Sequence, residues 1–231
     1  SLGAGGKGYF VLDVTNPGDA TNLVIADQTS STDADIGHIF GPPVPAEFNP
    51  QRSLQIAKMN NDRWALITGN GYNSTNGRPV LLIQYLSGTG ASLEKITAAS
   101  TGANATDNGL STPRPVDLNG DGTVDVIYAG DLKGNMWKFD VSNKVPTGNW
   151  GVALGGNPLY IAKDSTDTRQ PITSAPNVRT NKSVGGMMVA FGTGRNVTEG
   201  DRSDRTSIQT VYSILDETKY TLDSDVANKG K

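Results

Sequence analysis

The sequence predicts an all-β fold, a segment of a β-propeller with about three to four blades of antiparallel four-stranded sheets. Short β-branched and aromatic runs alternate with turns, and the 28 glycines of the chain suit many tight turns. A pattern of a first strand, a turn and a middle strand returns three times, and the middle strands end at Gly69, Gly130 and Gly192, which are 61 and 62 residues apart. This recurrence in an all-β chain is typical of propeller blades. A plain β-sandwich would explain the strands but not the recurrence.

The composition excludes several classes of site and partner. The 231 residues suffice for one all-β domain or two small ones. With 20 basic and 23 acidic residues the net charge is −3 and no basic stripe is present, so nucleic acid is not an expected partner. The absence of cysteine excludes disulfides and thiol catalysis, and no apolar run approaches the roughly 18 residues of a membrane-spanning helix. The chain opens without an initiator Met directly into a strand, which suggests a piece of a larger protein.

The first blade is expected over residues 8–26, with a strand at 8–14 and a short strand at 23–26. The next segment, 27–50, is polar and contains four prolines, so we expect a long irregular connection there. The only histidine, His38, lies in this segment. Nothing near it in the sequence suggests a ligand or a base, so we expect a surface or packing role for His38.

Three further blades are expected at 53–97, 111–163 and 173–216, and residues 1–231 are expected to form part of one propeller domain. The predicted strands are 53–60, 64–71, 80–86 and 92–97 in the first of these, 111–119, 126–131, 134–140 and 158–163 in the second, and 174–181, 187–194 and 208–216 in the third. The middle strands are almost continuously apolar, which favours burial between neighbouring blades.

Several residues outside the candidate site are expected to have structural roles. Trp64 and Trp137 lie in predicted strands and are expected to pack between blades. The charged loop 195–204 is expected to form a solvated face. Three aspartates are expected to close turns or strands: Asp131, Asp140 and Asp216.

The segment 117–125, which reads DLNGDGTVD, is the strongest candidate for a functional site. Oxygen-bearing side chains stand at its positions 1, 3, 5 and 9, and they can converge only if the backbone coils tightly. Gly120 and Gly122 permit this coil because glycine adopts a positive φ without steric cost. Three carboxylates so close together repel one another unless a hard cation lies between them, and Ca2+ accepts several oxygen ligands in irregular geometry. We therefore expect Ca2+ to be bound by four side chains and the carbonyl of Thr123, the side chains being those of Asp117, Asn119, Asp121 and Asp125.

The context of this loop is β-structure. An EF-hand loop would end with a Glu at position 12 and would be flanked by helices. Here position 12 is Tyr128, and 124–129 is a β-branched and aromatic run that predicts a strand. An acidic Asn-Gly turn that binds no metal is the alternative interpretation. The equivalent turns of the neighbouring blades, 60–63 and 181–184, lack the carboxylate set, so the ion is expected to have a local function or to act as a local staple.

Several motifs resemble the PilY family of type IV pilus biogenesis and tip-associated proteins. The motif at 110–122, LSTPRPVDLNGDG, is long and specific. Supporting motifs are GNGYNS at 69–74, YAGDLKGNMWKFD at 128–140 and FGTGR at 191–195, so the likeness extends from about Gly8 to Asp216. The resemblance implies a modified β-propeller with a single calcium loop, and the family's ligand positions fall on the five residues proposed above.

The resemblance also implies a function. The expected role is that of a non-enzymatic calcium-binding module of pilus machinery, in which Ca2+ occupancy is tied to pilus extension against retraction, and so to twitching motility and surface adhesion. The expected partners are pilins or minor pilins of the type IV pilus and a host or surface receptor. The expected location is the cell surface at the pilus, or the periplasm in association with the outer membrane. No Arg-Gly-Asp tripeptide is present, so integrin-type adhesion has no support.

Two other functions are weighed against this one. A quinoprotein-like propeller dehydrogenase would share the glycine-rich strand ends and the tryptophans. The sequence argues against it, because it has one histidine, no cysteine and no cluster of acid, base and cofactor ligands. A generic extracellular adhesion propeller stapled by calcium would share the loop, and binding to pilins would distinguish it from a pilus module.

Overall fold

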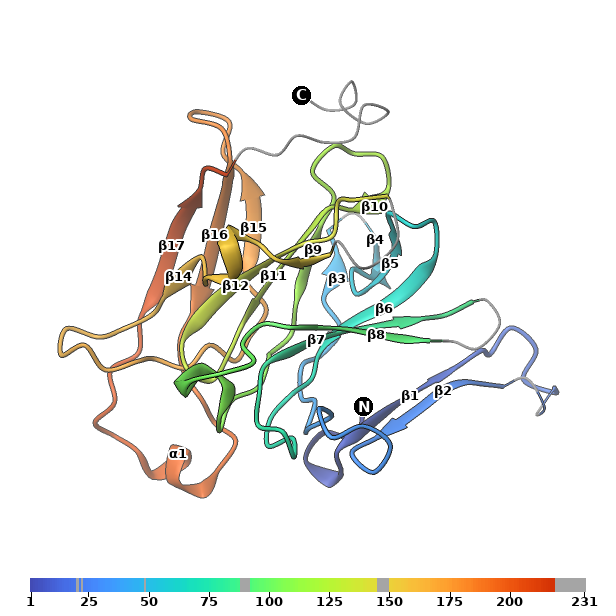
Figure 1. Ribbon diagram of the computed structural model, residues 1–231, viewed down its shortest axis with the longest axis horizontal. Helices are drawn as coiled ribbons and strands as arrows, with labels where there is room; N and C mark the ends of the chain where they lie inside the picture. The colour runs from blue at the N-terminus through green and yellow to red at the C-terminus, as the bar shows by residue number, and fades with distance from the viewer. Residues whose placement is uncertain (20, 22, 48, 88–91, 145–149, 219–231) are drawn as a thin grey trace.

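The computed structural model describes residues 1–19, 21, 23–47, 49–87, 92–144 and 150–218. Within these residues the fold is all-β, with one short α-helix, α1 (Glu199–Ser203), and 3₁₀ turns at Gly3–Gly5, Ala103–Ala105 and Leu154–Gly156. Figure 1 shows the sheets following one another in chain order, from the blue hairpin at lower right to the orange-red sheet at left. The prediction of an all-β fold built from repeated sheets is therefore confirmed.

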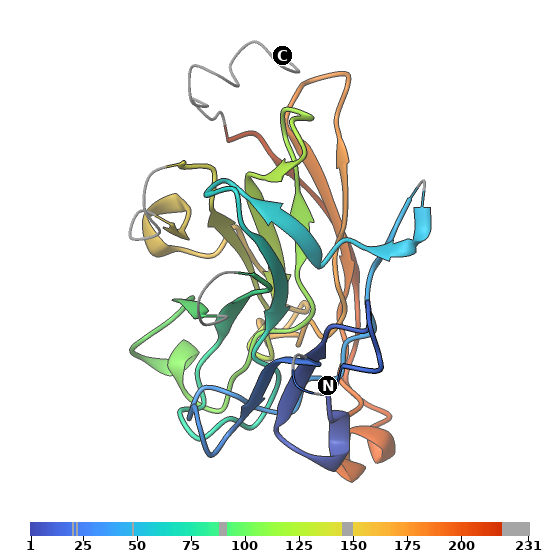
Figure 2. The ribbon, with the colours of Figure 1, turned by 90° about the vertical axis from the view of Figure 1, so that its right-hand side faces the viewer.

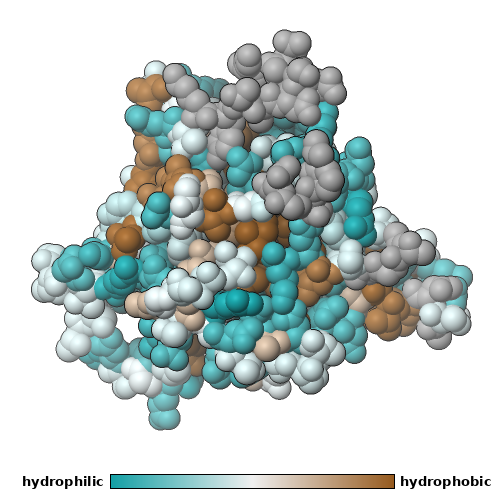
Figure 3. Space-filling model, in the orientation of Figure 1, coloured by the Kyte–Doolittle hydropathy of each residue, from teal (hydrophilic) through white to brown (hydrophobic). Residues whose placement is uncertain are grey.

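The N-terminal hairpin pairs β1 (Gly8–Leu12) with β2 (Val24–Thr29) in antiparallel orientation. Tyr9 and Ala26 are buried, whereas Phe10, Leu12 and Val24 are exposed. This alternation is that of a hairpin with one face packed on the body. Figure 3 shows the resulting apolar patch at lower right, over the hairpin.

The connection predicted as irregular over 27–50 contains a second hairpin, formed by β3 (Pro45–Ala46) and β4 (Asn49–Ser53). That part of the prediction was wrong. Proline is tolerated at the start of a strand and on edge strands, and this pair lies at the edge of the molecule, where Figure 2 shows it projecting from the body.

The next sheet contains the strands of the first full copy of the repeat: β5 (Ile56–Met59), β6 (Trp64–Gly69), β7 (Val80–Tyr85) and β8 (Leu93–Thr97). They pair consecutively and antiparallel. A fifth strand, β10 (Thr123–Val124), joins this sheet parallel to β5, although it belongs to the loop 117–125 of the following sheet. The parallel strand was not predicted, because two residues carry no periodic signal.

The middle sheet pairs three strands antiparallel: β9 (Arg114–Val116), β11 (Val126–Gly130) and β12 (Asn135–Asp140). Its outer edge is divided between two short strands that pair with opposite ends of β12, namely β13 (Gly151–Val152) and β14 (Tyr160–Ile161). The single outer strand predicted at 158–163 is therefore only half of this edge.

The last sheet contains β15 (Asn177–Thr180), β16 (Met187–Gly192) and β17 (Val211–Asp216), paired antiparallel. Among the described residues no fourth strand joins it. The expected four-stranded pattern is thus complete in the two sheets that have a neighbour on both sides.

The apolar strands β7 and β11 are buried on both faces, whereas in β16 of the last sheet only Val189 and Phe191 are buried. In β7, Leu81 and Ile83 pack in a core shared with the middle sheet, whereas Val80 and Leu82 face a core shared with Tyr9 of the N-terminal hairpin. In the same way, alternate residues of β11 face the β5–β8 sheet and the β15–β17 sheet. Because successive side chains of a strand point to opposite faces, a strand between two cores is apolar at every position.

The two tryptophans that were expected to pack between sheets differ in their burial. Trp137 is buried in the core between the first full sheet and the middle sheet, as predicted. Trp64 is 42% exposed, and the guanidinium of Arg52 lies 5.5 Å from its ring centroid, so the prediction for Trp64 was wrong. Trp64 begins β6 at the rim of its sheet, where an arginine stacks on the ring.

The recurrent glycines mark the closest approach between sheets. A Cβ on Gly69 would lie 2.1 Å from the Ser111 carbonyl oxygen, and a Cβ on Gly130 would lie 2.2 Å from the Ile172 Cγ2 atom. Both contacts are made to the segment that enters the next sheet. Gly192, on the last sheet, has no described atom within 4 Å of such a Cβ. The recurrence in the sequence therefore reflects a steric requirement where one sheet meets the next.

Candidate metal centre

The predicted metal loop connects β9 to β11 and includes β10. Gly120 and Gly122 adopt φ values of 79° and 90°, and nothing lies within 4 Å of a Cβ built on either. The positive φ, rather than close packing, is therefore what requires glycine at these two positions. The tight coil that was expected from their spacing is present.

Within the first half of the loop, side-chain oxygens accept hydrogen bonds from the backbone. The Asp117 carboxylate accepts from the N–H groups of Gly120, at 2.7 Å, and of Gly122, at 2.8 Å. The Asn119 Oδ1 atom accepts from the Asp121 N–H at 2.7 Å. Asp121 Oδ1 accepts from both the N–H and the hydroxyl of Thr123, at 2.8 and 2.6 Å. These contacts satisfy the backbone of a loop that has no regular secondary structure.

Asp125 closes the loop from inside the protein, with 1% of its surface exposed. Its Oδ2 atom accepts from the Leu118 N–H at 2.8 Å, which ties the two ends of the loop together. Burial, together with the charges of Asp117 and Asp121, raises the pKa of Asp125 to about 6, against hydrogen bonds from Leu118 and Asn60 that lower it. A cation beside this carboxylate would favour its charged form.

The neighbouring sheet contributes one side chain that sequence reasoning missed. Asn60 lies in the turn after β5, and its Nδ2 atom donates to the Val124 carbonyl at 2.8 Å and lies 3.4 Å from Asp125 Oδ1. The only sequence signal was that 60–63 is the turn equivalent to the metal loop. The structure shows that these two equivalent turns touch.

Residues 117–125 fit a hard cation by the chemistry of their donors, since every candidate ligand atom is an oxygen. Their side chains are not gathered, however. Among the described residues, no group of three or more His, Cys, Asp or Glu side chains is placed so that it could hold a metal ion. The Nδ2 atom of Asn119 is buried without a hydrogen-bond partner, so the loop has one unsatisfied polar atom at its centre. Ion binding by this loop stays a prediction.

The remaining residues singled out in the sequence have structural contacts. The His38 ring lies 2.9 Å from the Gly3 carbonyl oxygen and 6.2 Å from the ring of Phe40, which agrees with a packing role. Asp131 is fully buried and accepts from the side chains of Asn135 and Trp137. Asp216 pairs with Lys138 of the middle sheet, and Asp140 accepts from Ser142 in the turn after β12.

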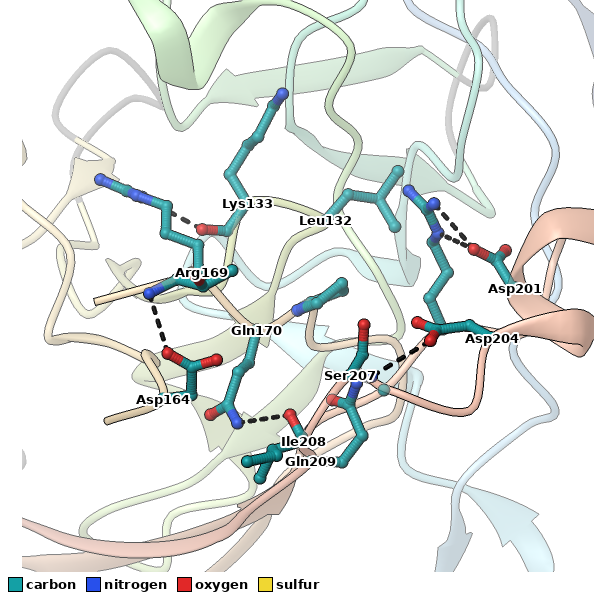
Figure 4. Close-up of a pocket in the computed structure, with 14 residues that line it drawn as sticks. Leu132, Lys133, Asp164, Arg169, Gln170, Asp201, Asp204, Ser207, Ile208 and Gln209 are labelled. Carbon is teal, nitrogen blue, oxygen red and sulfur yellow. Dashed lines mark hydrogen bonds and ion pairs between the residues drawn. The ribbon is translucent and has the colours of Figure 1, made fainter. Parts of the chain in front are cut away.

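The charged loop 195–204 lines a cavity of about 460 Å³ between the middle and last sheets. Figure 4 shows Asp164, Arg169 and Gln170 on one side of it and Asp201 and Asp204 on the other. Several of the charged and polar side chains contact the protein itself: Asp201 pairs with Arg195, and the Gln170 amide donates to the Ile208 carbonyl. Part of the loop forms α1, and most residues of 195–204 are exposed, which agrees with the expected solvated face.

Comparison with known proteins places the chain in a family. The family model described as the PilY1 beta-propeller domain matches residues 1–230. The chain belongs to the PilY1 beta-propeller family. The predicted family resemblance and the propeller class are thereby confirmed.

Individual proteins of this family are also similar to the chain. The chain is 39% identical over 235 residues to the type IV pilus biogenesis factor PilY1 of Pseudomonas aeruginosa strain PAO1, covering 94% of this chain and 19% of that protein. It is 39% identical over 227 residues to a PilY1 homolog of Xylella fastidiosa, covering 93% of this chain and 14% of that protein. The chain therefore spans less than a fifth of the length of these relatives.

A solved structure shows the same fold in the PilY1 family. The crystal structure of the Pseudomonas aeruginosa PilY1 C-terminal domain superimposes with a TM-score of 0.77 at 34% identity, covering 99% of this chain and 45% of that chain. The sheets described above therefore correspond to part of a PilY1 C-terminal domain. No helix among the described residues is long and apolar enough to cross a membrane.

Proposed function

We propose that this chain is a non-enzymatic, calcium-binding propeller module of type IV pilus machinery. The PilY1 relatives are named as type IV pilus biogenesis factors, which supports the pilus assignment and a location at the pilus, on the cell surface or in the periplasm. The observation that carries the calcium assignment is the coil at 117–125, in which both glycines adopt positive φ around a set of oxygen donors.

In this proposal Asp117, Asn119, Asp121 and Asp125 bind Ca2+ through side-chain oxygens and Thr123 binds it through its carbonyl. Ion binding must draw together carboxylates that now accept hydrogen bonds from the loop backbone. The ion supplies positive charge and no redox or acid–base chemistry. Ca2+ is favoured over Mg2+ because Mg2+ requires near-ideal octahedral geometry at about 2.0–2.1 Å and retains its waters.

The ion is proposed to act as a local switch on a partner surface. Without it, like charges 4 Å apart repel by about 4 kcal/mol per pair at an effective dielectric of 20, before relaxation and screening. The loop then opens, whereas β11 is held by its buried side chains. Ca2+ occupancy would thus shift the balance between pilus extension and retraction, and would thereby affect twitching motility and surface adhesion. The partners in this scheme are pilins or minor pilins, together with a host or surface receptor.

Two alternatives have separate tests. A quinoprotein-like propeller dehydrogenase would oxidise alcohols in a dye-coupled assay when quinone and Ca2+ are added. A generic adhesion propeller would bind Ca2+ but would fail to retain pilins in a pull-down.

The decisive variant for the calcium proposal is Asp125→Ala. We expect it to weaken Ca2+ binding more than about 100-fold, beyond the roughly 10- to 100-fold cost of changing an outer-shell group. Calorimetry with Ca2+ and with Mg2+ measures this. The control is Asp62→Ala in the equivalent turn, where Asp62 makes an exposed pair with Lys58. Equal binding by the Asp125→Ala variant and the parent, or tighter binding of Mg2+ than of Ca2+, would contradict the proposal.

The proposed effect of calcium on the pilus is tested in the full-length protein of a piliated strain. Asp125→Ala should alter piliation and twitching motility, and Asp62→Ala should not. If calcium binding is lost while piliation and motility remain normal, the ion is a structural staple and not a switch.

A further inference from the structure

Asn60 connects two sheets at the metal loop. It belongs to the turn between β5 and β6, whereas its hydrogen-bond partners belong to the loop before β11 and to the segment after β12. Its Nδ2 atom donates to the carbonyl oxygens of Val124, at 2.8 Å, and Val141, at 3.1 Å. Its Oδ1 atom lies 3.1 Å from the Thr123 hydroxyl oxygen, whose one proton lies between Asn60 Oδ1 and Asp121 Oδ1, the latter at 2.6 Å. Both ends of one amide are thus used to hold the neighbouring sheet.

Asn60 is buried, and it lies next to the parallel pairing of β10 with β5. Asn60 is 5% exposed, and parallel pairing places Thr123 opposite Lys58 and Val124 opposite Met59. Met59 and Val124 belong to the same apolar core. Figure 1 shows β10 lying beside β5, away from the sheet that contains β9 and β11. Thr123 and Val124 are therefore held by the neighbouring sheet, whereas the backbone of Asp125 bonds to Val116 and Val141 of its own sheet.

We propose that Asn60 is a positioning residue for the metal loop, and that ion binding is coupled through Asn60 to the contact between the two sheets. The inference rests on the proposed calcium function of the loop. Asn60 holds the peptide of Val124, which lies between the carbonyl of Thr123 and the side chain of Asp125. Loss of Asn60 therefore removes the contact that fixes the peptide next to both proposed ligands, although Asp125 keeps its hydrogen bonds with Leu118, Val116 and Val141. Because coupling between sites is reciprocal, ion binding must also stabilise the turn that carries Asn60.

The test compares Asn60→Ala with Asn61→Ala, a variant of the next residue in the same turn. Asn61 bonds only within its own sheet in the contacts described, to the Tyr85 hydroxyl and the Arg63 N–H. In calorimetry we expect Asn60→Ala to weaken Ca2+ binding roughly 10- to 100-fold, as outer-shell changes do. Asn61→Ala should bind as the parent does. Equal affinities for the two variants would overturn the inference.

Hydrogen exchange gives a readout of the coupling itself. Added Ca2+ should slow exchange at 56–60 in the parent and in Asn61→Ala, but not in Asn60→Ala. A calcium effect confined to 115–125 in the parent would overturn the coupling. If the parent binds no Ca2+, the calcium proposal fails. In that case, faster hydrogen exchange at 123–125 in metal-free Asn60→Ala than in the metal-free parent would still support the role of Asn60 in positioning the loop. Unchanged exchange at 123–125 would overturn that role.

A second variant covers a failure of Asn60→Ala to fold. Thr123→Val removes the hydroxyl that lies 3.1 Å from Asn60 Oδ1 and 2.6 Å from Asp121 Oδ1, and it keeps the backbone carbonyl. It should weaken Ca2+ binding in the same direction, and in a folded double variant the combined effect should be smaller than the sum of the two single effects. Additive effects, or parent-like affinity of Thr123→Val where Asn60→Ala does not fold, would overturn the inference.

Discussion

At the scale of single residues, Asp35 shows how this fold accommodates buried charge. Its carboxylate is 1% exposed and accepts from Arg78 Nε at 2.7 Å, Arg78 Nη2 at 2.9 Å, Lys95 Nζ at 2.8 Å and Asn76 Nδ2 at 2.7 Å. Burial raises the pKa of Asp35, but these hydrogen bonds outweigh it and hold the pKa well below its usual range. Asp35 thus ties the long connection after β2 to the sheet that contains β7 and β8.

The variant Asp35→Asn should lower the free energy of unfolding by about 2–4 kcal/mol at neutral pH, because hydrogen bonds to a charged group are lost and Arg78 loses its carboxylate, whereas Lys95 keeps its ion pair with Asp33. A lowered native pKa contributes stability above the unfolded value of about 3.9, and this stability is lost as the pH falls below that value. Urea unfolding between pH 7 and pH 3 should therefore show a smaller pH dependence for the variant. The control Asp62→Asn, at an exposed pair, should match the parent; equal slopes for parent and Asp35→Asn would contradict the prediction.

At the scale of elements, neighbouring sheets are joined by polar contacts as well as apolar cores. Lys138 of β12 and Asp216 of β17 form an ion pair in which both side chains are 1% exposed. The Tyr128 hydroxyl of β11 also donates to Asp216, at 2.7 Å. Burial raises the pKa of Asp216, but the hydrogen bonds from Lys138, Thr218 and Tyr128 lower it by more. The pair fixes the last sheet against the middle sheet.

Lys138→Met should destabilise the protein by about 3–5 kcal/mol, because it leaves a carboxylate buried without its cation. Chemical denaturation measures the change. Lys163→Met is the matched control, since Lys163 pairs with an Asp167 that is 81% exposed, and its effect should stay within about 0.5 kcal/mol. Similar losses for the two variants would show that the buried pair has no special role.

At the scale of the whole molecule, the proposed ion should stabilise the fold without being required for it. The strand pairings other than that of β10 with β5 lie outside the metal loop, and the turns 60–63 and 181–184 lack the carboxylate set. The sheets and their three cores should therefore persist when the ion is removed.

Chelation with EDTA should lower the melting temperature by about 5–10 °C relative to a hundredfold excess of Ca2+ over Kd, which contributes about 2.7 kcal/mol. Circular dichroism at 25 °C should retain the β signal, and the Asp125→Ala variant should melt at the same temperature with and without EDTA. Loss of the β signal in EDTA would show instead that the ion is essential for folding.

Local patterns in the sequence were sufficient to predict most strands and the repeat. β-branched runs and turn residues report the backbone conformation of their own segment and the side chains that point into a core. The coil at 117–125 could be predicted for the same reason, because Gly120 and Gly122 report the φ values of their own residues. These features are properties of a residue and its near neighbours.

The contacts between sheets were decided by the tertiary structure. Asn60 and Val124 are separated by 64 positions, and Lys138 and Asp216 by 78. No local pattern encodes which turn will touch the metal loop, or that β10 will leave its own sheet to pair with β5. The exposure of Trp64 was missed for the same reason. The hairpin after Pro43 pairs near neighbours instead, and it was missed because its prolines favour an irregular connection. Burial and pairing at a sheet boundary depend on the packing of a distant segment, and a single sequence carries no direct record of that packing.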